Sequence, residues 1–127
     1  MIELHEKYSC RAKHSEFSIN YRSYEYIKKA IEYIRLNIKE KLTLEDISGH
    51  VNVSRFHLSK EFKRLTGKTI FEFVNITRCN KADLLLRQGV SATETAHLCG
   101  FENLSYFSRT FKKYIGKLPS EIYLYHS

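Results

Sequence analysis

Turn-forming residues are scarce in this chain. Its 127 residues include one proline and five glycines. A fold of many short strands needs a glycine- or proline-rich turn about every 8–12 residues. The composition therefore argues against an all-β protein and favours helices.

Cysteine is also sparse, and its spacing excludes two kinds of site. Cys10, Cys79 and Cys99 lie far apart, without a C-x-x-C pair or a Cys/His cluster at zinc-ligand spacing. A disulfide framework is not expected, and a reduced, cytoplasmic setting fits better. We expect Cys79 and Cys99 to be core thiols, with a redox or metal role as the alternative.

The sequence lacks membrane and enzyme signatures as well. No apolar run approaches the roughly 20 residues needed to span a bilayer, and the N-terminal segment is too polar for a signal peptide. G-x-S-x-G, Walker and H-E-x-x-H motifs are absent. His50, His57 and His97 are expected to pack or flank rather than to bind metal. We therefore expect no enzyme, no membrane protein and no cofactor.

Apolar and basic residues are plentiful. Hydrophobic residues make up 43% of the chain, enough for a packed core, and 21 Lys and Arg against 14 Asp and Glu give a net charge of +7. Such an excess favours a polyanionic partner, which is either nucleic acid or an anionic membrane surface.

An internal repeat is the most informative feature. Shifted by 49 positions, EDISGHVNVSRFHLSKEFKRLTGK from Glu45 aligns with ETAHLCGFENLSYFSRTFKKYIGK from Glu94. The identical pairs are Glu45/Glu94, Ser59/Ser108, Phe62/Phe111, Lys63/Lys112, Gly67/Gly116 and Lys68/Lys117. One structural unit is therefore predicted to occur twice.

Each copy is predicted to be a helix-turn-helix. In the first, Thr43 and Ser54 can cap the two helices and Gly67 can end the second; the equivalent residues in the second are Ser91, Asn103 and Gly116. Further helices are predicted over Tyr24–Ile38, Ile70–Arg87 and from Pro119 onward. The expected fold is all-α with about seven helices. Its parts are a tail or linker (1–20), a first helix-turn-helix subdomain (21–68), a linker helix (69–88) and a second helix-turn-helix subdomain (89–127).

The second helix of each unit has a basic face. At about 100° per residue, Leu58, Phe62 and Leu65 are predicted to point inward in the first unit, and Phe107, Phe111 and Tyr114 in the second. The opposite faces have Phe56, Ser59, Lys60 and Lys63, and Ser105, Ser108, Arg109 and Lys112, and neither has an acidic residue.

Such faces suit the major groove of DNA. Lys and Arg donate to guanine, Ser pairs with several base edges, and an aromatic ring contacts the thymine methyl group. A linker helix of about 18 residues is about 27 Å long, comparable with the roughly 34 Å turn of B-DNA. One chain is thus expected to enter two successive major grooves at an asymmetric site. The alternative is a nonspecific basic nucleic-acid-binding module.

These segments resemble the DNA-binding domain of AraC/XylS transcription regulators. The resemblance rests on VSRFHLSKEFKRLTGKT (53–69), RCNKADLLL (78–86) with its Arg-x-x-x-Ala, and GFENLSYFSRTFKKYIGKLPSE (100–121). It departs at Thr95, where the family usually has isoleucine, and at Leu118, where a capping threonine commonly precedes the proline.

The resemblance implies a sequence-specific regulator, an activator that contacts RNA polymerase in the bacterial nucleoid. Base contacts carry over to Phe56, Ser59, Lys60, Leu104, Ser105, Tyr106, Ser108 and Arg109. Arg55, Lys63, Lys112 and Lys113 are expected to contact the DNA backbone. A stand-alone regulator would bind as a monomer; the alternative is the DNA-binding fragment of a longer effector-sensing protein.

Overall fold

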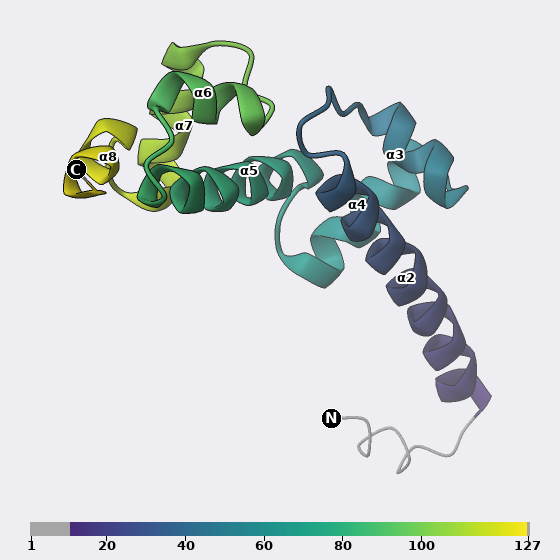
Figure 1. Ribbon diagram of the computed structural model, residues 1–127. Helices are drawn as coiled ribbons and strands as arrows, with labels where there is room; N and C mark the ends of the chain where they lie inside the picture. Colours follow the sequence, from purple (N-terminus) through teal and green to yellow (C-terminus); the bar gives the residue numbers. More distant parts are fainter. Residues whose placement is uncertain (1–10, 127) are drawn as a thin grey trace.

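The computed structural model describes residues 11–126 of the chain. Along these residues the secondary structure is entirely helical (Figure 1). The helices are α2 (Arg11–Leu36), α3 (Leu44–Val51), α4 (Arg55–Thr66), α5 (Ile70–Arg87), α6 (Ala92–Leu98), α7 (Leu104–Ile115) and α8 (Pro119–His126). These seven helices confirm the predicted all-α fold, with helix-turn-helix pairs α3–α4 and α6–α7 joined by α5.

The helix ends lie where the capping residues predicted them. The Thr43 hydroxyl accepts the Asp46 N–H at 3.0 Å, and the Asn103 side chain accepts the Tyr106 N–H at 2.7 Å. Gly67, which ends α4, has a φ of +78°, a left-handed conformation that side chains disfavour. Local sequence therefore determines where most of these helices begin and end.

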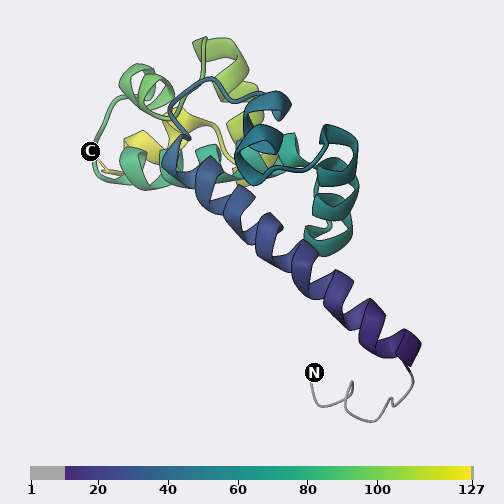
Figure 2. The same cartoon turned by 90° about the vertical axis from the view of Figure 1, so that its right-hand side faces the viewer.

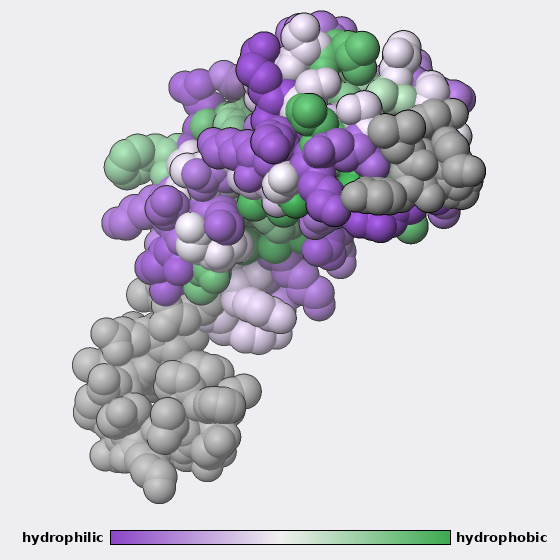
Figure 3. Space-filling model, turned by 90° about the vertical axis from the view of Figure 1, so that its left-hand side faces the viewer, coloured by the Kyte–Doolittle hydropathy of each residue, from purple (hydrophilic) through white to green (hydrophobic). Residues whose placement is uncertain are grey.

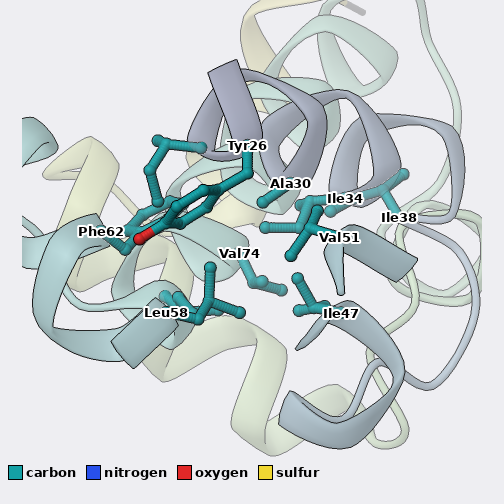
Figure 4. Close-up of a cluster of buried hydrophobic side chains, with 11 residues drawn as sticks. Tyr26, Ala30, Ile34, Ile38, Ile47, Val51, Leu58, Phe62 and Val74 are labelled. Atoms are coloured by element: carbon teal, nitrogen blue, oxygen red, sulfur yellow. The ribbon is translucent and has the colours of Figure 1, made fainter. Parts of the chain in front are cut away.

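Two hydrophobic cores share α5. The first core joins α2, α3 and α4 to the N-terminal half of α5 through Ile70 and Val74 (Figure 4). The second core joins α6, α7 and α8 to the C-terminal half through Cys79, Ala82 and Leu86. The α3–α4 unit thus lies at one end of α5 and the α6–α7 unit toward the other (Figure 1).

Helix α2 begins earlier than predicted. It starts at Arg11, where the sequence led us to expect a tail up to residue 20 and a helix from Tyr24. No proline or glycine interrupts residues 11–23, so a helix that is held by the core at Ile27 and Ile34 can extend in the N-terminal direction. The extension projects away from the two units (Figure 2). Residues 1–10, which include Cys10, lie outside the described residues.

One inward assignment was wrong. Leu65 is 38% exposed, because the last turn of α4 runs past the edge of the first core. Leu58 and Phe62 are fully buried as predicted, and so are Phe107 and Phe111. Tyr114 is half-buried and packs against the second core. Along residues 11–126, no helix is long and apolar enough to cross a membrane.

Candidate nucleic-acid interface

Helix α4 exposes to solvent the side chains that the helical period predicts on its outward face. Since Leu58 and Phe62 are buried, the opposite side of the helix is open to solvent. Phe56 is 81% exposed, although an aromatic ring of this size gains about 1.5–3 kcal/mol from burial. Ser59, Lys60 and Lys63 are exposed on the same helix. This side of α4 therefore combines an apolar ring, a hydroxyl and two cations.

The single carboxylate of α4 is withdrawn from that surface. Glu61 is buried, and its Oε1 accepts from Arg64 Nη2 at 2.6 Å and from Arg64 Nε at 2.9 Å. These hydrogen bonds hold the pKa of the Glu61 carboxyl below its ordinary value. The burial of Glu61 leaves the exposed side of α4 without negative charge.

Helix α7 repeats this arrangement. Phe107 and Phe111 are buried in the second core, and α7 has no acidic residue. The predicted base contacts on α7 are exposed except for one, Ser108, which is half-buried. The exposed ones are Leu104, Ser105, Tyr106 and Arg109, and the predicted backbone contacts Lys112 and Lys113 are exposed as well.

Several of the predicted contact residues have intramolecular partners. The Tyr106 hydroxyl accepts a hydrogen bond from Asn75 of α5 at 3.2 Å, and the Arg109 guanidinium lies 6.0 Å from the Tyr106 ring centroid. Arg55 donates to Glu45 of α3 at 2.7 Å. Tyr106 is therefore held toward the linker helix, and Arg55 has to share its donors between Glu45 and any phosphate.

A hollow between the two units was not foreseen from the sequence. It has a volume of about 300 Å³ and is lined by Lys41 and Leu42 of the first unit, by Arg78 of α5, and by residues of the second unit that include Tyr106 and Arg109. Lys41 thus lines the same hollow as Tyr106 and Arg109 of α7. Lys41 lies outside the repeat, so no pattern in the sequence could have drawn attention to it.

Cys79 and Cys99 are buried thiols. Burial raises the pKa of the Cys79 thiol to about 12 and that of Cys99 to about 11, so neither is a thiolate near neutral pH. The ring centroids of His50 and Tyr33 lie 4.5 Å apart, and those of His57 and Tyr26 lie 5.7 Å apart, so both imidazoles pack against tyrosine rings. Within the described part of the chain, no group of His, Cys, Asp and Glu could hold a metal ion.

The chain resembles known proteins over both helix-turn-helix pairs. A family model described as a helix-turn-helix domain matches residues 47–123, from α3 into α8. A solved transcriptional regulator of the AraC type from Chromobacterium violaceum is 29% identical and has a TM-score of 0.76, over 83% of this chain and 95% of that one. The chain belongs to the AraC/XylS family of transcription regulators.

Other similar proteins are longer or more distant in sequence. The Xylose operon regulatory protein of Haemophilus influenzae is 31% identical over 87% of this chain and 30% of its own length. The chain spans between 24% and 46% of the length of the first curated relatives that it matches. The DNA-binding domain of AdpA, solved in complex with a target DNA, shares the fold at 21% identity, with a TM-score of 0.74 over 79% of this chain and 91% of that one.

Proposed function

We propose that this chain is a sequence-specific reader of double-stranded DNA that inserts α4 and α7 into two successive major grooves. The single observation on which the proposal rests is the duplicated exposed surface, basic and without carboxylates, on the second helix of each unit. Because Glu61 is buried beside Leu58 and Phe62, the one acid of α4 does not repel phosphate at this surface. Uniform positive charge attracts phosphate, and hydroxyl and apolar groups add contacts to base edges.

The length of α5 supports the use of two grooves by one chain. Its 18 residues correspond to about 27 Å, and the two units lie toward its opposite ends (Figure 1). Successive major grooves on one side of B-DNA are about 34 Å apart. Because α4 and α7 differ in sequence, the DNA site should have two different halves.

The contact residues divide by side-chain chemistry. We assign base contacts to Phe56, Ser59, Lys60, Leu104, Ser105, Tyr106, Ser108 and Arg109, and backbone contacts to Arg55, Lys63, Lys112 and Lys113. Lys60 and Arg109 are the strongest candidates for contacts with guanine. While the Tyr106 hydroxyl accepts from Asn75, its own O–H can still donate to a base edge or a phosphate.

The direct test is selection of bound duplexes from a random-sequence pool at about 0.15 M salt. We expect one asymmetric motif with two conserved segments about one helical turn apart. Equal affinity for RNA and for every duplex would instead show a nonspecific basic module and refute sequence recognition.

Variants separate the two kinds of contact. Lys60→Ala and Arg109→Ala should each relax selection at different bases, at a cost of about 1–3 kcal/mol for a bidentate contact. Lys63→Ala and Lys112→Ala should weaken all sequences alike and lower the salt slope by about one unit. Arg87→Ala is the matched control, because Arg87 lies on α5 and pairs with Asp83 at 3.0 Å. A uniform loss from Arg109→Ala would reassign Arg109 to a phosphate.

We infer the regulatory context from the family resemblance. We propose that DNA binding serves activation through contact with RNA polymerase, within the bacterial nucleoid, and that one chain occupies one site. An effector-sensing region of a longer regulator is the alternative source of control. A transcription assay with the selected site upstream of a promoter would distinguish activation from repression.

A further inference from the structure

Helix α5 passes from one core to the other within about one and a half turns. Val74 is the last of its residues in the first core, and Cys79 is the first in the second core. Arg78 lies between them, at the boundary of the two units. In the sequence it stood out only as the first residue of the Arg-x-x-x-Ala motif, and DNA contact leaves it without a role.

The Arg78 side chain joins the two units. Its Nε donates to the Ile38 carbonyl oxygen at 3.1 Å, and its Nη2 donates to the Glu40 carbonyl oxygen at 2.8 Å. Both carbonyls belong to the segment between α2 and α3 in the first unit. On the other side, the guanidinium lies 5.9 Å from the ring centroid of Phe101, a buried residue of the second unit.

The backbone of the second unit also lies close to Ile38 and Arg78, at Gly100. Gly100, in the turn between α6 and α7, has a φ of +86°, and a Cβ there would lie 2.5 Å from the Ile38 carbonyl oxygen. It would also lie 3.1 Å from the Arg78 guanidinium. The two units therefore touch at a junction made of Ile38, Arg78 and Gly100, with no room for a side chain at residue 100.

Packing beside the junction is incomplete. The hollow of about 300 Å³ separates Lys41 and Leu42 of the first unit from Tyr106 and Arg109 of the second. Contact between the units at this place is thus concentrated on the junction. Burial lowers the pKa of the Arg78 guanidinium, but arginine remains charged at neutral pH, so both hydrogen bonds are charge-assisted.

We propose that Arg78 is a positioning residue that fixes the orientation of the two helix-turn-helix units, and thereby the spacing between the two DNA segments that α4 and α7 read. This inference rests on the proposed function. Continuity of α5 sets the distance between the units, while Arg78 and Gly100 restrict bending and rotation at the boundary.

The test varies the spacing of the selected site. Insertion or deletion of one base pair between the two segments rotates one against the other by about 34°. The wild type should prefer one spacing by about tenfold or more, equivalent to about 1.4 kcal/mol. Arg78→Gln should bind the altered spacings nearly as well as the original, with unchanged base preference within each segment. Arg87→Gln, at an exposed position of the same helix, should keep the wild-type dependence of affinity on spacing, here called the spacing profile.

A glycine pair provides a second, independent comparison. Gly100→Ala and Gly116→Ala both force an alanine into a left-handed conformation, with φ values of +86° and +93°, but nothing lies within 4 Å of a Cβ at Gly116. Only Gly100→Ala should broaden the spacing profile. An unchanged profile in folded Arg78→Gln or in folded Gly100→Ala, whatever the loss of overall affinity, would overturn the proposal.

A measurement on the free protein separates this proposal from DNA recognition. Spin labels at Gly49→Cys in α3 and Ser120→Cys in α8, in a Cys10→Ser background, report the distance between the units by pulsed electron resonance. We expect one narrow distribution for the wild type and for Arg87→Gln, and a broad one for Arg78→Gln. An equally narrow distribution in Arg78→Gln would refute the positioning role, even if a DNA motif is found. Failure to select any motif would refute only the proposed function.

Discussion

Thr95 has a buried hydroxyl in the second unit that forms only a long hydrogen bond. Its side chain is fully buried, and its hydroxyl has one partner, the Val90 carbonyl oxygen, at 3.4 Å. Good O–H···O bonds are about 2.5–3.0 Å long, so this contact recovers little of the roughly 1–3 kcal/mol that burial of a hydroxyl costs. Thr95→Val keeps the shape and adds a buried methyl group. We expect the free energy of unfolding to rise by about 1–2 kcal/mol.

The matched control is the same change at a well-bonded threonine. The Thr66 hydroxyl donates to the Phe62 carbonyl oxygen at 2.7 Å and accepts the Lys68 N–H at 3.1 Å. Thr66→Val should therefore lower the free energy of unfolding by about 1–2 kcal/mol. Urea denaturation followed by circular dichroism measures both. If Thr95→Val destabilised the protein by as much as Thr66→Val, the argument from hydrogen-bond length would be refuted.

Three further outcomes are expected. Phe62→Ala and Phe111→Ala, each at a fully buried position, should each lower the free energy of unfolding by about 3–5 kcal/mol in denaturation curves, and normal melting would mean that the inward faces are wrong. Because the folded pKa of Glu61 lies below its ordinary value of 4.5, its ion pair stabilises the fold above about pH 4.5 and is lost as pH falls through the folded pKa. Glu61→Gln should remove that part of the acid sensitivity of the melting temperature, and an unaltered pH profile would contradict it. Phe56→Ala should leave the melting temperature unchanged, because the ring is 81% exposed. In a titration with sites that have thymine in the first segment, the same variant should bind DNA more weakly. Affinity equal to that of the wild type would exclude contact between Phe56 and thymine.

The repeat, the caps and the apolar period were sufficient to predict the fold. Ser54, Thr69 and Asn103 cap helices through side-chain bonds to residues three positions away, so the relevant information is local and visible in the sequence. The exposure of Lys60 and Arg109 followed from the same local period.

The remaining features depend on contacts between distant residues. The partners of Arg78 are backbone carbonyls of Ile38 and Glu40, which any residue type would provide, so no sequence pattern marks them. The burial of Glu61 and the exposure of Leu65 depend on how α4 lies on the first core, which an ideal helical wheel cannot show. The hydrogen bond from Asn75 to Tyr106 likewise joins residues 31 positions apart.

Seen from the side of α8, much of the surface is polar, and hydrophobic residues form only separate spots (Figure 3). The apolar side chains of the second unit are instead gathered in the core that α5 completes. Each half of α5 spans only about two and a half turns, too short to stay helical by itself. Loss of packing at Ile70 would thus loosen the half of α5 that holds Leu86 in the second core. Loss of packing at Leu86 would likewise loosen the half that holds Ile70 in the first core. We therefore expect denaturation to be all-or-none across both units. A cell would then contain either intact molecules or fully unfolded chains that proteases remove. If α4 and α7 enter two grooves as proposed, no half-structured species would occupy one groove and block the site.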